Sequence, residues 1–195
     1  MATADGRRSA WVSVRLVIVV LCGVAPVLTG CSSLQGTGSK QYVGGDGGIR
    51  LIAAPDRGHP VALEGTDLEG HQLSLAAMRG KPTVVTIWWA ACPPCREEAP
   101  TLVAASKRLG SSANFVGIDI RDLGTAAPKA FVAHFGVPWS SFYSPGGKAM
   151  LAFTGTLSPN AVPATVVLDS RGRVAATIAG VVPSVLTLTE MVRSA

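Results

Sequence analysis

The sequence predicts an α/β sandwich in which helices flank a central mixed β-sheet. Two observations predict this fold class. Strand-like and helix-like segments alternate through the second half of the chain, and a strand, a turn, a second strand and a helix close it. The 195 residues are 48% hydrophobic and 15% charged, which is typical of one globular domain with a processed leader.

The amino-terminal segment has the pattern of an export signal. Three arginines precede the apolar run 16–28, which is short for a membrane span and is interrupted by a glycine and a proline. Small residues follow this run, so we assign residues 1–30 to a signal peptide. An uncleaved anchor is the alternative, and the pair Arg7-Arg8 leaves twin-arginine export open beside the general secretory route.

The end of this signal, Leu28-Thr29-Gly30-Cys31, resembles the bacterial lipobox, in which the cysteine receives a lipid and becomes the first residue. The resemblance implies a lipoprotein, with palmitate on Cys31, held on the extracytoplasmic face of the cell membrane. Residues 34–50 are rich in glycine and polar residues, which is typical of a flexible tether. We therefore expect the lipid attachment and tether at 31–57 and one folded domain at 58–195.

The folded domain is expected to begin with a β-hairpin, because two short apolar runs at 61–63 and 73–75 flank a turn region. Residues 83–88 are β-branched and aromatic, which predicts a buried strand. A helix follows as far as about Arg108, with a kink expected at Pro100. The remaining expected elements are a strand at 115–120, a helix at 126–135, a strand at 141–143, a short helix at 148–153, a strand pair at 164–168 and 174–178, and a terminal helix at 183–193.

Two cysteines lie where the strand 83–88 meets the following helix. The first turn of a helix has unpaired N–H groups and a partial positive charge, which favour a thiolate at Cys92 and lower its pKa. Pro93 and Pro94 are tolerated there because N–H groups of the first turn have no intrahelical acceptor. Cys92 and Cys95 are three residues apart, so they share one helix face and lie close enough to form a disulfide.

The number of cysteines favours a redox role for this pair. Cys22 would leave with the signal peptide and Cys31 would carry the lipid, so the mature domain keeps only Cys92 and Cys95. A disulfide that closes so short a loop restricts the unfolded chain little and is a poor structural link. We therefore interpret Cys92 and Cys95 as a working redox pair.

The charge of the chain gives no sign of nucleic-acid binding. Removing residues 1–30 takes away three of the 17 basic and one of the 12 acidic residues, which leaves a net charge of +3. Basic runs interleaved with aromatic residues, which nucleic-acid-binding proteins show, are absent from the sequence.

Several motifs together resemble the TlpA/ResA-like extracytoplasmic thiol-disulfide oxidoreductases of the thioredoxin superfamily. They are the WWAACPPC run at 88–95, Pro100, the AVPATVVLD segment at 161–169, and the strand, turn, strand and helix at the end of the chain. The resemblance covers about residues 58–195. It implies a thioredoxin-like sandwich whose cysteine pair exchanges disulfides with other proteins.

The resemblance also implies how substrates bind. Val162-Pro163 would form the cis-proline loop that faces the two cysteines, and the Val162 backbone would pair with an extended substrate segment. An ordinary trans proline before a strand is the alternative. Trp88 matches an aromatic residue of the family and is a second candidate for contact with the substrate, although a tryptophan in a core strand often serves packing alone.

Glu98 is the candidate proton carrier. It lies three residues after Cys95 and returns to the same helix face, whereas Glu97 does not. In ResA-like proteins the matching acidic residue is associated with proton handling at the buried thiol. The alternative is an ordinary solvated carboxylate. Two departures from the family are Thr86, where many thioredoxins carry a buried acid, and Ala91, where a tryptophan often precedes the first cysteine.

The reaction implied by these residues is protein-disulfide reduction. Cys92 would attack a substrate disulfide, and Cys95 would resolve the mixed disulfide. The resemblance favours reduction, for example of cytochrome c precursor thiols before haem attachment, with electrons from a membrane thiol-transfer protein. We expect no cofactor and no bound metal.

Other functions stay open at this point. The same cysteine pair could oxidise or isomerise the thiols of exported proteins, because the reaction runs in both directions. It could also bind zinc or copper together with His59, His71 or His134, although these histidines lack metal-site spacing. A peroxidase on the same fold and a surface lipoprotein with a relic site are further alternatives.

Overall fold

The computed structural model describes residues 42–43 and 48–195 of the chain. Ser39–Ala195 forms one compact unit. The predicted signal peptide, Cys31 and most of the predicted tether lie outside the described residues. Within the described part of the chain, every helix is too short or too polar to cross a bilayer.

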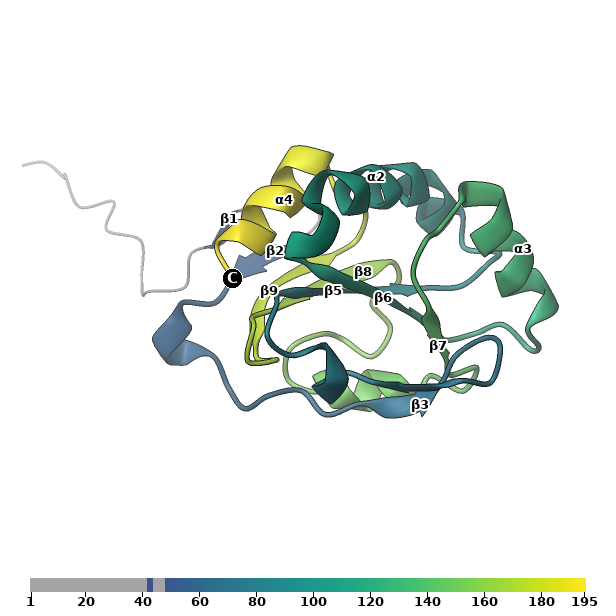
Figure 1. Cartoon of the computed structure of the whole chain (residues 1–195), viewed down its shortest axis with the longest axis horizontal. Helices are drawn as coiled ribbons and strands as arrows, with labels where there is room; N and C mark the ends of the chain where they lie inside the picture. The colour runs from purple at the N-terminus through teal and green to yellow at the C-terminus, as the bar shows by residue number, and fades with distance from the viewer. Residues whose placement is uncertain (1–41, 44–47) are drawn as a thin grey trace, which may run out of the picture. The chain divides into compact units, whose positions relative to one another are not determined.

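A mixed seven-stranded sheet forms the centre of the unit, with the strand order β1-β2-β9-β8-β5-β6-β7 (Figure 1). Strand β5, an interior strand of this sheet, is parallel to β6 and antiparallel to β8. The strands of this sheet are β1 (Tyr42–Val43), β2 (Ile49–Leu51), β5 (Thr83–Trp88), β6 (Asn114–Asp119), β7 (Ser141–Tyr143), β8 (Ala164–Leu168) and β9 (Val174–Ala179). The predicted thioredoxin-like sandwich with a mixed sheet is confirmed.

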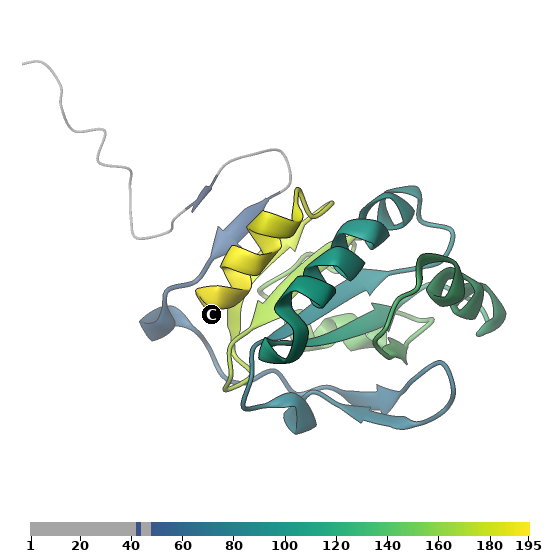
Figure 2. The same cartoon turned by 45° about the horizontal axis from the view of Figure 1, so that its top comes forward.

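Three helices cover one face of this sheet: α2 (Pro93–Leu109), α3 (Ala126–Phe135) and α4 (Val185–Arg193). Figure 2 shows α2 and α4 side by side above the strands. The opposite face is covered by the hairpin of β3 (Glu64–Thr66) and β4 (Gln72–Ser74) and by a 3₁₀ helix at Lys148–Phe153. Shorter 3₁₀ turns occupy Ala54–Asp56, Ala76–Met78 and Gly110–Ser112.

The sequence of β5 follows from its position between two apolar layers. All six of its residues are buried. Val84 packs with α2 and α4, whereas Val85 packs on the opposite side with Phe142 and Phe153. Because both faces of the strand are covered, its residues are β-branched or aromatic throughout, and its two threonines are buried with the rest.

The expected elements after residue 60 are present, with small shifts. The first hairpin strand lies three residues later than predicted and the second one residue earlier, and the short helix at 148–153 is of the tighter 3₁₀ type. Pro100 lies inside α2.

Two short strands, β1 and β2, lie where the sequence suggested only tether. Ile49–Leu51 pairs with β9 as strand β2. Its three residues follow a glycine-rich stretch and are too few to show a period of their own. The paired part of the chain therefore includes residues before position 58.

Candidate functional site

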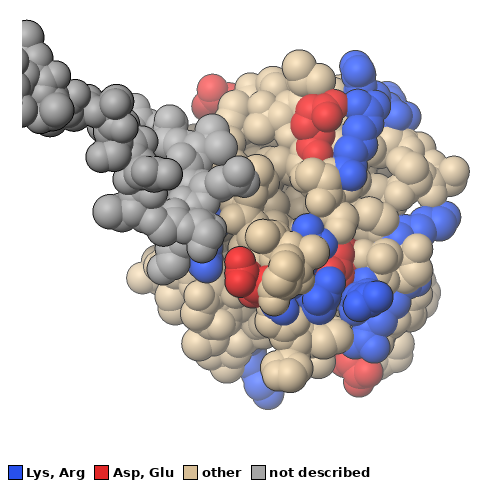
Figure 3. Space-filling view, turned by 90° about the vertical axis from the view of Figure 1, so that its left-hand side faces the viewer, with Lys and Arg blue, Asp and Glu red and all other residues tan. Residues whose placement is uncertain are grey.

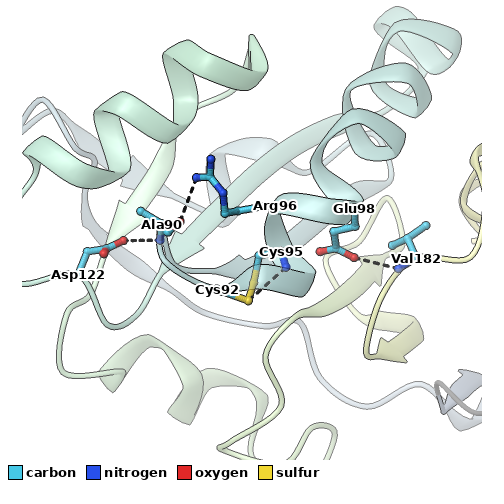
Figure 4. The surroundings of a disulfide bond; sticks show 7 residues. All are labelled: Ala90, Cys92, Cys95, Arg96, Glu98, Asp122 and Val182. Carbon is cyan, nitrogen blue, oxygen red and sulfur yellow. Dashed lines mark hydrogen bonds between the residues drawn. A yellow bond between two sulfur atoms is a disulfide. The ribbon is translucent and has the colours of Figure 1, made fainter.

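The two cysteines lie at the amino-terminal end of α2. Cys92 is the residue that caps this helix, and its Sγ accepts a hydrogen bond from the Cys95 backbone N–H at 3.2 Å. The two cysteines form a disulfide with their Cα atoms 5.2 Å apart (Figure 4). The pair therefore lies where the sequence predicted it, between strand β5 and the first turn of the following helix.

Both sulfur-bearing residues are largely covered. Cys92 is 3% exposed and Cys95 is 1% exposed. They pack in a small apolar cluster with Trp88, Ala99 and Phe131. Exposed surface next to the disulfide comes instead from the neighbouring Ala91 and Pro93.

Two polar side chains fix the loop that leads into Cys92. The Ala90 N–H donates to Asp122 Oδ2 at 2.7 Å, and the Ala90 carbonyl accepts from Arg96 at 3.3 Å (Figure 4). The Arg96 guanidinium lies over the ring of Phe135, 5.2 Å from its centroid. Sequence analysis missed these contacts, because Asp122 is 32 residues from Ala90 and no local spacing links them.

A further buried carboxyl lies behind this loop. Asp119 ends β6 opposite Trp88 and is fully buried. Neither of its side-chain oxygens has a hydrogen-bond partner among the described residues. Burial, followed by the nearby Asp122 carboxylate, raises the pKa of Asp119 to about 7. An aspartate inside the apolar run 115–120 is the sequence signal that could have identified it.

Glu98 is buried next to the disulfide and is not a solvated helix carboxylate. It is 2% exposed, and its Oε2 accepts a hydrogen bond from the Val182 N–H at 2.9 Å (Figure 4). Burial raises the pKa of Glu98 to about 7, although the hydrogen bond from Val182 acts in the opposite direction. Glu97, by contrast, is exposed. At neutral pH the Glu98 carboxyl therefore exists in both protonation states.

A cavity of about 20 Å³ joins several of these side chains. Cys95, Glu98 and Trp88 line it together with Thr86. A cavity of this size has room for about one water molecule, and the carboxyl of Glu98 and the hydroxyl of Thr86 are suitable partners. The other residues that line it are Ala99, Leu102, Phe131, Val137 and Trp139.

Trp88 serves packing and also lines this cavity. Its side chain is 5% exposed, and its ring stacks on Phe131 with the centroids 4.4 Å apart. The indole lies over Gly117, where a Cβ would come within 2.6 Å of the Trp88 Nε1. The ring therefore lies behind the disulfide, inside the protein.

The Val162-Pro163 peptide bond is cis, as the resemblance implied. Val162 packs against the apolar cluster that contains the disulfide. The Pro163 carbonyl accepts a hydrogen bond from the Gly180 N–H at 2.9 Å. Among the hydrogen bonds of the described residues, none involves the Val162 N–H or carbonyl.

The histidines considered as metal ligands do not gather at the cysteines. His71 lies on the β3–β4 hairpin, where its Nδ1 is 3.4 Å from an oxygen of Asp67. Across residues 48–195, no group of three histidine, cysteine, aspartate or glutamate side chains converges in a way that could hold a metal ion.

Comparisons with known proteins agree with this geometry. The Redoxin family model matches residues 53–192. The soluble secreted antigen MPT53 of Mycobacterium tuberculosis is 32% identical over 145 residues, which cover 65% of this chain and 79% of MPT53. The thiol-disulfide oxidoreductase ResA of Bacillus anthracis is 29% identical over 118 residues, covering 59% of this chain and 64% of ResA.

Solved structures show the same similarity. A DsbF homologue from Corynebacterium diphtheriae superposes with a TM-score of 0.70 and 28% sequence identity, over 75% of this chain and 92% of that one. With a disulfide at the start of α2 and a cis proline before β8, the chain belongs to the Redoxin family and is a TlpA/ResA-like thiol-disulfide oxidoreductase of the thioredoxin superfamily.

Proposed function

We propose that this protein is a membrane-anchored, extracytoplasmic oxidoreductase that reduces disulfides in other proteins. The observation that carries the proposal is the position of Cys92 at the cap of α2, with Cys95 and the buried Glu98 directly behind it. This arrangement provides an attacking sulfur, a resolving sulfur and a proton acceptor.

The reaction begins from the reduced pair. The Cys92 thiolate attacks one sulfur of a substrate disulfide and expels the other sulfur as a thiolate, which forms a mixed disulfide. Glu98 takes the proton of the Cys95 thiol through the cavity that both residues line. The Cys95 thiolate then attacks Cys92 Sγ and releases the second substrate sulfur. The substrate gains two electrons, and the pair is left oxidised.

The two prolines between the cysteines support reduction over oxidation. A capping side chain accepts from the N–H of the second or third helical residue. Pro94 occupies the second position and has no N–H, so Cys95 supplies the hydrogen bond to Cys92 Sγ. A thiolate with fewer donors is less stabilised, and a less stable reduced form makes the pair a stronger reductant.

The substrate segment is proposed to bind beside the cis-proline loop. The free N–H and carbonyl of Val162 could pair with an extended chain, as a strand adds to a sheet edge. Pro163 would fix that loop against the disulfide. Trp88 is proposed to support the site from within, because its ring is buried behind the two sulfurs.

Location and pathway are proposed from the sequence and the relatives. The lipobox-like Cys31 supports a lipoprotein with a signal peptide at 1–30, a tether at 31–57 and a catalytic domain at 58–195. One relative is named as a secreted antigen. We propose electron supply from a membrane thiol-transfer protein and a role in cytochrome c maturation, for which the resemblance to ResA-like proteins is the support.

Trapping in living cells tests the reaction. Cys95→Ser should accumulate mixed disulfides on Cys92, whereas Cys92→Ser and the double variant should not. The trapped proteins identify the substrates, and a mostly reduced Cys92–Cys95 pair at steady state supports the reductase direction. A mostly oxidised pair would instead indicate an oxidant, and equal insulin reduction by Cys92→Ser and the unaltered protein would exclude both.

Anchoring has a separate test. Cells labelled with a radioactive or clickable palmitate should incorporate it into the protein, and Cys31→Ser should abolish the incorporation and release the protein from the membrane fraction. Labelling that survives in Cys31→Ser would contradict the proposed attachment site.

A further inference from the structure

One end of the domain is strongly basic. Five exposed lysines and arginines gather there from three separate segments, and none forms an ion pair within the described part of the chain. They are Arg79 and Lys81 before β5, Lys107 and Arg108 in the last turn of α2, and Arg171 in the turn between β8 and β9.

Hydrogen bonds between the three segments show that they meet. The Gly80 N–H donates to the Ser170 carbonyl at 2.8 Å, which joins the segment before β5 to the β8–β9 turn. The Asn114 side chain, just past the end of α2, donates to the Met78 carbonyl at 2.7 Å. We call this surface, formed by the five cations, the basic end. Figure 3 views the molecule from the left of Figure 1, where blue side chains lie with red ones among them.

The basic end lies opposite the disulfide. Helix α2 is capped by Cys92 and reaches Lys107 and Arg108 in the last turn of its 17 residues. At 1.5 Å per residue this places the basic end about 25 Å from the cysteines. The strands agree, since Lys81 precedes the first residue of β5 whereas Cys92 follows its last.

The carboxylates near the basic end leave its charge largely uncompensated. Asp169 is buried and already pairs with Arg57 and Arg173. Glu190 pairs with Arg193. Asp56 forms no ion pair within the described part of the chain, and the Ala195 carbonyl accepts a hydrogen bond from Arg57. Lys107 and Arg108 can be explained as cations that stabilise the carboxyl end of helix α2. Arg79, Lys81 and Arg171 have no such explanation.

Strands β1 and β2 run in opposite directions relative to this end. Leu51 pairs with Ala176 near the start of β9, so β2 runs toward the basic end. Strand β1 is antiparallel to β2, with Tyr42 opposite Arg50 and Val43 opposite Ile49. Strand β1 therefore runs away from the basic end, and its first residue is the one nearer to that end.

We propose that the basic end is a membrane-facing surface that binds the anionic headgroups of the bilayer. The proposal deepens the lipid anchoring proposed above and rests on it for its biological setting. With this end against the lipid, Cys92 and Cys95 are held on the far side, where the disulfides of other proteins can reach them. Lysines and arginines near an anionic bilayer each contribute about 1 kcal/mol of attraction, which is roughly fivefold in binding.

Vesicle binding of residues 32–195, which retain the compact unit Ser39–Ala195 but carry no lipid, tests this surface directly. At low salt the protein should co-sediment with vesicles that contain one third phosphatidylglycerol and not with pure phosphatidylcholine vesicles. Lys81→Gln with Lys107→Gln should weaken this binding by about tenfold or more. Lys129→Gln with Lys148→Gln removes the same charge elsewhere and should leave it within about twofold. Raising the salt to 0.5 M should abolish the binding.

Equal binding of the two double variants would overturn the proposal, and so would equal binding to neutral and anionic vesicles. Tighter binding to a 20-base-pair DNA duplex than to anionic vesicles at the same salt would also overturn it, because the surface would then be a general polyanion site. Insulin reduction should be unchanged in Lys81→Gln with Lys107→Gln. Failure of vesicle binding is therefore distinct from failure of the redox function, and palmitate incorporation at Cys31 is measured separately.

Discussion

At the scale of single residues, Glu98 should make the rate of catalysis depend on pH. Its pKa is raised to about 7, so the ionised form that can accept the Cys95 proton grows as the pH rises through neutrality. We expect Glu98→Gln to lower the rate of insulin reduction at pH 8 by roughly tenfold or more and to remove the rise in rate near pH 7. Rates measured from pH 5 to 9 would show this. An unchanged profile in the variant would exclude Glu98 as the proton acceptor.

The raised pKa of Glu98 also makes the stability of the folded protein depend on pH. In the unfolded chain Glu98 ionises near 4.5, whereas in the folded protein it keeps its proton until about pH 7. The folded state therefore loses relative stability between these two values as the pH rises. In Glu98→Gln, the urea concentration at the midpoint of unfolding should therefore change less between pH 5 and pH 8 than it does in the unaltered protein. Asp119 titrates over a similar range in both proteins, so the difference between them isolates Glu98.

Pro94 determines how well the Cys92 thiolate is stabilised. Pro94→Ala restores an N–H at the second helical position, within reach of the capping sulfur. A hydrogen bond to a charged group is worth roughly 1.5 to 3 kcal/mol, so the pKa of Cys92 should fall by about one unit or more. The reduction potential should rise by roughly 30 mV. Thiolate absorbance at 240 nm and equilibration with glutathione measure the two changes.

The matched control for this variant is Pro93→Ala, because the first helical N–H is not the usual donor to a capping side chain. A shift in Pro93→Ala as large as that in Pro94→Ala would contradict the proposed hydrogen bond.

At the scale of elements, the contact between β5 and β6 depends on a glycine. A Cβ at Gly117 would overlap Ser141 and come within 2.6 Å of Trp88 Nε1. Gly117→Ala should therefore destabilise the fold by about 1 to 3 kcal/mol and displace the Trp88 ring. Gly146→Ala is the control, since no atom lies within 4 Å of its added Cβ. Denaturant unfolding compares the stability of the two variants. Equal stability would contradict the prediction, because it would show that β6 and β7 shift to make room for the added methyl group.

Elements with a strong local signal could be predicted from the sequence, and those held by distant partners could not. Strands β5 and β8 are rich in β-branched residues, β6 has an apolar centre, and α2 is marked by its cysteines and prolines. Strand β2 has three residues and exists because β9 pairs with it. The Asp122 contact to Ala90 depends likewise on how two loops meet in space. The order of motifs predicted the positions of Cys92, Cys95 and Pro163, while the burial of Glu98 required the structure.

At the scale of the whole molecule, Arg57 joins the two ends of the described domain. Its side chain donates to the Ile52 carbonyl at 3.1 Å, to Asp169 at 3.2 Å and to the Ala195 carbonyl at 2.7 Å. Burial alone would raise the pKa of Asp169, but hydrogen bonds from Arg173 and Arg57 outweigh it and hold the pKa below its ordinary value of 3.8.

Removing the Arg57 charge should therefore destabilise the whole domain. We expect Arg57→Gln to lower the free energy of unfolding by about 2 kcal/mol at pH 7. The contribution of ionised Asp169 is present above its ordinary pKa and is lost as the pH falls through the lower folded value. The difference between Arg57→Gln and the unaltered protein should thus shrink at pH 2.5. Arg171→Gln, an exposed arginine of the same region, should stay within about 0.5 kcal/mol of the unaltered protein.

Trp88 lines the same cavity as Cys95, so its intrinsic fluorescence should report whether the cysteine pair is oxidised or reduced. Disulfides quench the fluorescence of nearby tryptophans, so breaking the Cys92–Cys95 bond should brighten the emission. Stopped-flow fluorescence could then follow a single turnover without dyes or labelled substrate. The size of the fluorescence change across a series of glutathione redox buffers would give the reduction potential of the Cys92–Cys95 pair.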